Sequence, residues 1–143
     1  IPQGSTIDSV FLTFVATSGD QGTTVLTNLA LEDVDNAAQI TSAADFNGRT
    51  LTAVVAWDNL ASWVAGTSYA TPSLVTPFQT VINRAGWSNN NAVNIFWKDD
   101  GSSVSAVRQG ATIEHATYTE PVLTITWTEP SGALPDASYA GVF

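Results

Sequence analysis

The chain has 143 residues, enough to bury the core of about one domain, and an apolar fraction of 44% excludes intrinsic disorder. Thirteen acidic residues against four basic ones give a net charge of −9, which argues against binding to nucleic acid or to anionic lipid. There is no cysteine, and no apolar run approaches the length of about 18 residues that membrane insertion requires.

Alternation of apolar and polar residues predicts short β-strands along most of the chain. The first, residues 6–16, places Val10, Leu12 and Phe14 on one face. A polar turn at residues 18–22 follows it, and residues 99–102, of the Asp-Gly type, predict a hairpin turn. Further strands are expected at residues 23–31, 50–57, 92–98, 104–108, 112–118 and 121–127.

Residues 71–87 carry the only helical periodicity in the chain. An apolar stripe on one helical face is formed by Leu74, Phe78, Val81 and Ile82. We expect Thr76 to cap the helix, Pro77 to occupy its first position and Gln79 to close a capping box. Gly86 is expected to end the helix in the left-handed conformation.

Short strands separated by turns, with one helix, predict an all-β protein. The expected architecture is an antiparallel β-sandwich of jelly-roll type, with the short α-helix packed on it, over residues 1–129. Residues 130–143 differ in composition, because Gly, Pro, Ser and Ala dominate and Tyr139 and Phe143 are the only large side chains. This segment is predicted to be a linker or a docking arm.

Five stretches taken together resemble one protein family: residues 1–7, 32–38, 52–57, 74–87 and 121–125. They are similar to β-sandwich modules, related to DNRLRE-type domains, of large extracellular bacterial proteins, polysaccharide-degrading enzymes and some phage structural proteins. The resemblance covers residues 1–128 and implies a jelly-roll-like, non-catalytic module that in some cases binds carbohydrate. The chain departs from the family in lacking a strand before its first block and in carrying Trp97 where an aliphatic residue is expected.

An acidic cluster directly after the second predicted strand is the best candidate for a metal site. It comprises Glu32, Asp33, Asp35 and Asn36. Calcium binds about six to eight oxygen atoms, and closely spaced carboxylates in a tight loop are able to converge on one ion. The alternative is a polar turn in which Asp and Asn side chains bond the local backbone. A structural Ca²⁺ ion is therefore one of two expectations for this loop.

Aromatic side chains are the candidates for binding a sugar, because flat rings stack on the C–H faces of sugars while nearby polar groups bond the hydroxyls. Trp57 and Trp87 lie in the family blocks and Trp127 lies just after the last one, and all three are expected in the core. The candidates are Trp97, Tyr118 and Trp63, the last in a predicted loop. For each of them the alternative is ordinary packing in the core.

No catalytic motif of the common hydrolase, protease or nucleotide-binding classes occurs, and His115 is the only histidine. The chain is therefore not expected to be an enzyme. We expect a secreted, extracellular module that binds a polysaccharide of acidic or marine type, which requires cations to bridge it to the acidic chain. The alternative is a structural module of a virion surface (a decoration or tail protein) or of an extracellular filament, with neighbouring protein subunits as partners. Outward-facing Phe11 and Val15, and a tail ending in Phe143, favour that alternative.

Overall fold

The computed structural model describes residues 1–17 and 24–131. In chain order the elements are β1 (Thr6–Val15), β2 (Leu26–Leu31), α1 (Ala43–Gly48), β3 (Val55–Asp58), β4 (Ser68–Ala70), α2 (Val75–Ile82), β5 (Ile95–Asp99) and β6 (Val122–Thr128). The regular secondary structure of the described residues is thus mostly β-strand, which confirms the all-β prediction. The turn expected at residues 18–22 and the C-terminal arm from residue 132 lie outside the described residues.

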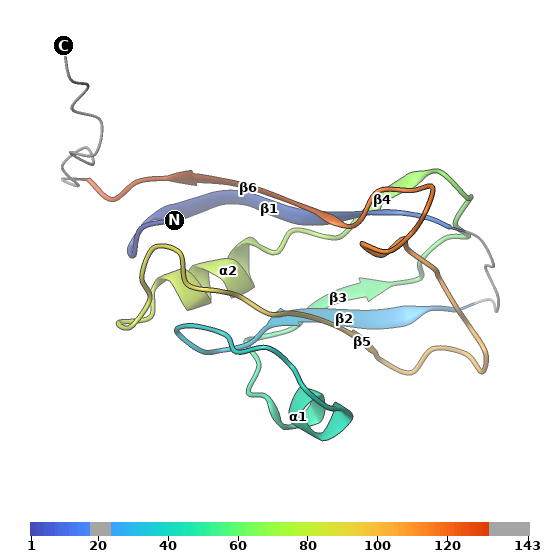
Figure 1. Cartoon of the computed structure of the whole chain (residues 1–143), viewed down its shortest axis with the longest axis horizontal. Coiled ribbons are helices and arrows are strands. Elements are labelled where there is room, and N and C mark those ends of the chain that lie inside the picture. The colour runs from blue at the N-terminus through green and yellow to red at the C-terminus, as the bar shows by residue number, and fades with distance from the viewer. Residues whose placement is uncertain (18–23, 132–143) are drawn as a thin grey trace, which may run out of the picture.

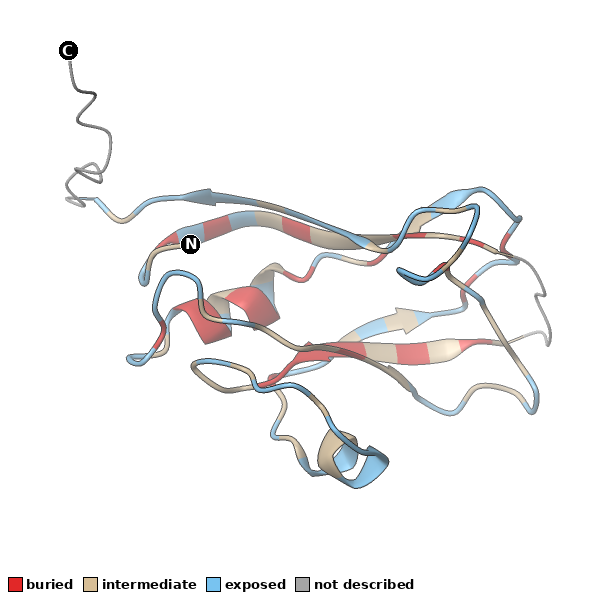
Figure 2. Ribbon diagram, in the orientation of Figure 1, coloured by how far each residue is buried: buried red, intermediate tan, exposed pale blue. Residues whose placement is uncertain are grey.

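The strands form two antiparallel sheets of three strands each, in the orders β4-β1-β6 and β3-β2-β5. The first strand pairs with the last, so that Thr6 lies opposite Thr128 and Thr13 lies opposite Val122. Figure 1 shows the two sheets as two layers, with α2 between them at one end. The helix and the sheets together enclose the buried residues (Figure 2).

One half of the core is built around α2. The predicted stripe is confirmed, because all four of its side chains are buried at 2% exposure or less. They pack in one cluster with five residues from elsewhere in the chain: Ile7, Val10, Leu29, Leu31 and Trp87. Burying each large apolar side chain contributes about 1.5–3 kcal/mol. The helix therefore fills the space between the sheets at this end and holds them apart.

The other half of the core is aromatic. Phe14 of β1 lies with its ring centroid 4.8 Å from Trp97 and 6.3 Å from both Trp57 and Trp63. These rings are tilted or offset, as aromatic pairs prefer. Large flat side chains thus separate the two sheets at the end where no helix does so.

The ends of α2 differ from the prediction. The helix begins at Val75 with Leu74 as N-cap and no side-chain capping bond, so Thr76 lies in the first turn. Pro77 is tolerated there because the first helical N–H groups have no intrahelical partner. Gln79 makes no capping box; it reaches β1 instead. Gly86 is not among the glycines with positive φ, so it does not end the helix in the left-handed region.

Two predicted strands are wrong. Residues 104–108 and 112–118 form turns and isolated bridges, and two of their large apolar side chains lie in solvent, with Val104 95% and Ile113 76% exposed. The predicted turn at residues 99–102 is present, with Gly101 at a φ of 88°. The chain does not return along β5 after it; the N–H of Ser103 donates to the carbonyl of Thr24 instead.

Two elements were not predicted, α1 and β4. Helix α1 begins where the Ser42 hydroxyl accepts a hydrogen bond of 3.0 Å from the N–H of Asp45, a local N-cap. Strand β4 is three residues long and pairs with the end of β1. Among the described residues, neither helix is long and apolar enough to cross a membrane.

Candidate ligand-binding site

The structure brings two of the three predicted sugar-binding residues together. The rings of Trp63 and Trp97 lie 6.1 Å apart in the aromatic half of the core. Trp63 is only 7% exposed and stacks on Tyr69, with the ring planes 5° from parallel and the centroids 4.7 Å apart. Because its faces are covered, Trp63 offers little surface on which a sugar could stack.

Tyr118 lies apart from these two residues. Its ring packs over Gly66, where a Cβ atom would come within 3.5 Å, and it stacks on His115 at a centroid distance of 5.1 Å. The Nδ1 atom of His115 accepts hydrogen bonds from the N–H groups of Thr117 and Tyr118, so this atom carries no proton. His115 and Tyr118 together brace a surface loop.

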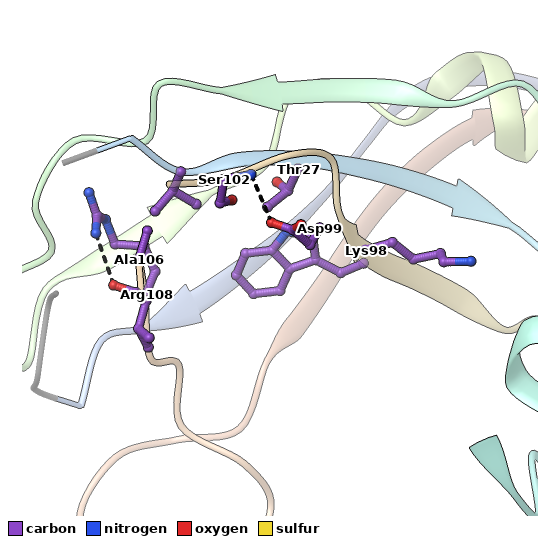
Figure 3. Close-up of a pocket in the computed structure, with 9 residues that line it drawn as sticks. Thr27, Lys98, Asp99, Ser102, Ala106 and Arg108 are labelled. Atoms are coloured by element: carbon purple, nitrogen blue, oxygen red, sulfur yellow. Dashed lines mark hydrogen bonds between the residues drawn. The ribbon is translucent and has the colours of Figure 1, made fainter. Parts of the chain in front are cut away.

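Trp97 is half-buried and lines a pocket of about 260 Å³ that opens to solvent. The pocket lies where β2 and β5 meet the segment after the 99–102 turn (Figure 3). Its walls combine apolar with polar groups. They are formed by Val25, Thr27, Trp97, Lys98, Asp99, Ser102, Ala106, Val107 and Arg108.

Asp99 supplies the negative charge at this pocket. Hydrogen bonds from the Ser102 hydroxyl and from the N–H groups of Gly101 and Ser102 lower the pKa of Asp99, because they favour its ionised form. The carboxylate is exposed, so it remains a hydrogen-bond acceptor for a ligand hydroxyl at neutral pH. The Asp99–Ser102 bond is drawn in Figure 3.

The basic side chains near the pocket are committed to other contacts. Lys98 extends away from Asp99 in Figure 3, and its Nζ lies 5.3 Å from the ring centroid of Phe46. Arg108 donates to the carbonyls of Leu60 and Ala61 at 2.7 and 2.8 Å. These bonds fix the segment that closes one side of the pocket.

The indole N–H of Trp97 is buried and has no hydrogen-bond acceptor in the described part of the chain. Leaving a buried donor unpaired costs about 1–3 kcal/mol, so such groups are rare in folded proteins. The sequence singled out Trp97 but missed Thr27, Asp99 and Ser102. The signal for the last two was the turn at residues 99–102, which was interpreted only as a turn.

The acidic loop is held by two arginines. Arg84 pairs with both Asp33 and Asp35 at 2.6 Å, and Arg49 pairs with Glu32 at 2.8 Å. The remaining candidate, Asn36, accepts a hydrogen bond from the backbone of the segment before β5.

Each carboxylate of this loop thus already has a cationic partner. Within the described ranges, no three His, Asp or Glu side chains converge in a way that could hold a metal ion. A Ca²⁺ ion at Glu32, Asp33, Asp35 and Asn36 stays a prediction.

Comparison with protein-family models, with curated proteins and with solved structures found no match to this chain.

Proposed function

We propose that the chain is a non-catalytic β-sandwich module of jelly-roll type that binds carbohydrate at the pocket beside Trp97. The observation that carries the proposal is the combination of an indole ring with Thr27, Asp99 and Ser102 around one open pocket. An aromatic surface next to hydroxyl and carboxylate groups suits the mixed apolar and polar surface of a sugar.

The dimensions and charge of the pocket narrow the class of glycan. Its volume of about 260 Å³ is below the range of about 300–1,000 Å³ typical of sites for drug-sized ligands. This favours one sugar ring of a longer chain. The net charge of −9 and the Asp99 carboxylate repel anionic glycans, so we propose a neutral polysaccharide. Such a module would work outside the cell, where polysaccharides are abundant.

Affinity electrophoresis in gels containing neutral or acidic polysaccharides tests this proposal. We expect retardation by a neutral polysaccharide, and its loss in Ala106→Phe, which places a large side chain on the pocket wall. Asp99→Asn should weaken retardation by removing the charged acceptor. The matched control is Ala44→Phe, which adds the same side chain at an exposed position of α1. Absence of retardation on every polysaccharide would overturn the proposal.

One observation favours a second candidate function, that of a structural module of a virion or an extracellular filament. Strand β6 lies at the edge of its sheet and is uncharged, and such an edge is able to pair with a neighbouring protein. In this case the partners would be protein subunits.

A further inference from the structure

The inner face of β6 is incompletely covered. In register, Trp127 lies opposite Ile7, and Ile125 lies opposite Val10. Residues directly opposite in an antiparallel pair share a face of the sheet. Ile7 and Val10 are 3% and 1% exposed, whereas Trp127 is 41% exposed. The apolar face of the sheet is therefore buried under β1 and open under β6.

A groove of about 220 Å³ runs beside this uncovered face. It joins β6 to the α2 half of the core. Its apolar wall includes Phe78, Ile82, Trp87, Val93, Leu123 and Ile125. Leu123 is 37% exposed, although it shares the inward face of the sheet with Ile125. The core thus reaches solvent along one side of the molecule, between β6 and α2.

The other edge strands carry features that discourage pairing with another chain. Strand β3 has four residues and contains Asp58, strand β5 contains Lys98 and Asp99, and β4 has only three residues. Charges and short length are the usual protections of a sheet edge. Strand β6 has seven residues, none charged and none proline, and in the described part of the chain it pairs with β1 alone.

Both ends of β6 are bordered by carboxylates. Glu120 precedes the strand and Glu129 follows it, and both are exposed. At the second end, Asp8 accepts a hydrogen bond from the Thr128 hydroxyl. No ion pair to these three carboxylates is present in the described part of the chain. The uncovered strand is thus an apolar strip with a negative charge at each end.

We propose that β6 accepts an extended segment of another protein as an added strand, and that this segment carries alternating apolar residues between Lys or Arg residues. The apolar residues would cover the groove, the backbones would continue the sheet, and the basic ends would meet Glu120 and Glu129. A seven-residue strand is about 23 Å long, so about seven to nine residues suffice. The inference rests on the assembly function proposed above, and it is independent of carbohydrate binding.

A second copy of this chain fits the edge less well. Antiparallel pairing of two β6 strands would bring Glu120 of one copy towards Glu129 of the other, and each copy carries a net charge of −9. Like charges across such a junction disfavour it. The acidic ends therefore select a basic partner.

Two synthetic peptides test the proposal, KTVTITVTK and ETVTITVTE, which share an apolar alternation and differ only in their end charges. We expect the basic peptide to bind about tenfold more tightly at low salt, with the difference reduced by salt. Hydrogen exchange should show new protection of β6 amides. The double variant Glu120→Lys/Glu129→Lys changes only exposed side chains and should reverse the preference.

Several outcomes would overturn the inference. Binding of neither peptide, equal binding of both, or binding without protection of β6 each contradict it. Sedimentation of the unliganded protein separates this failure from that of the assembly function. If the protein self-associates but binds neither peptide, the proposal of a basic partner is refuted and the assembly function is supported. A monomer that binds neither peptide would refute both.

Discussion

The side-chain oxygen of Gln79 accepts a hydrogen bond of 2.8 Å from the backbone N–H of Ile7. The amide nitrogen of the same side chain donates to the carbonyl of Ser5 at 2.9 Å. One residue of α2 thus satisfies both a donor and an acceptor on the entry to β1. The helix is attached to the sheet by directional bonds as well as by its apolar stripe.

Gln79→Ala is expected to lower the free energy of unfolding by about 2–3 kcal/mol, because two largely buried backbone groups lose their partners. Chemical denaturation measures the change. The control is Thr76→Ala on the same helix, which should change stability by less than about 0.5 kcal/mol because Thr76 is exposed and does not cap the helix. A larger loss for Thr76→Ala than for Gln79→Ala would reverse this assignment.

Phe78→Ala is expected to cost about 3–5 kcal/mol, because Phe78 is 2% exposed and its truncation leaves a cavity in the α2 half of the core. Retardation by polysaccharide should be unchanged in the variant below its unfolding transition, since the Trp97 pocket lies in the aromatic half. Thermal unfolding and affinity electrophoresis test the two statements separately. Loss of retardation in the folded variant would show that the two halves are coupled.

The hydroxyl of Ser5 is buried without a hydrogen-bond partner in the described part of the chain. Ser5→Ala should therefore raise the free energy of unfolding by about 1 kcal/mol or leave it unchanged, since it removes an unpaired polar group. Ser9→Ala is the comparison, because the Ser9 hydroxyl pairs with that of Thr126 at 2.7 Å. That variant should lose about 0.5–1 kcal/mol. Equal destabilisation by both substitutions would contradict the assignment.

The Arg49 guanidinium lowers the pKa of Asp45 from 3.8 to about 2, with a further contribution from the N–H of Thr41. A depressed pKa in the folded state gives a stabilisation that is complete above the unfolded value and is lost as pH falls through about 2. Arg49→Met should thus be less stable than the wild type at pH 6, with the difference shrinking towards pH 2. Denaturation curves across that range measure it; a constant difference would rule out the ion pair as its source.

Gly86→Ala is expected to destabilise the protein by about 1–2 kcal/mol, because a Cβ atom there would overlap the Asp35 carboxylate and displace it from Arg84. Gly48→Ala is the matched control. No atom lies within 4 Å of a Cβ at Gly48, which is the last residue of α1. That substitution should be neutral or slightly stabilising. Thermal unfolding of both variants gives the comparison, and similar values for the two would contradict the overlap.

The apolar pattern predicted the stripe of α2 and, apart from β4, the strands of both sheets, because periodicity reports which side chains are covered. It failed at residues 104–108 and 112–118, where the alternation is real but the described part of the chain supplies no partner strand, so Val104 and Ile113 remain exposed. Helix α1 was missed although its cap was visible in the sequence, since Ser42 precedes Asp45 at the spacing of an N-cap bond.

The candidate pocket was predictable only in part. Trp97 stood out as an aromatic residue where an aliphatic one was expected. Thr27 joins it because β2 pairs with β5, with Thr27 opposite Asp99, a contact that depends on long-range register. The ion pairs of the acidic loop also depend on a long-range contact, because Arg84, which pairs with Asp33 and Asp35, lies about 50 residues further along the chain.

The pairing of β1 with β6 also bears on how the protein is made. Among the described elements β1 is synthesised before the others and β6 after them, so the pairing of Thr6 with Thr128 waits until this whole stretch has been made. Until then β1 lacks its β6 neighbour, although Ile7 and Val10 already have α2 and β2 to pack against. Contacts between such distant parts of a chain slow folding and leave growing chains prone to aggregation. We therefore expect the docking of β6, whose outer edge has no partner strand in the described part of the chain, to be a late step in the folding of this sheet.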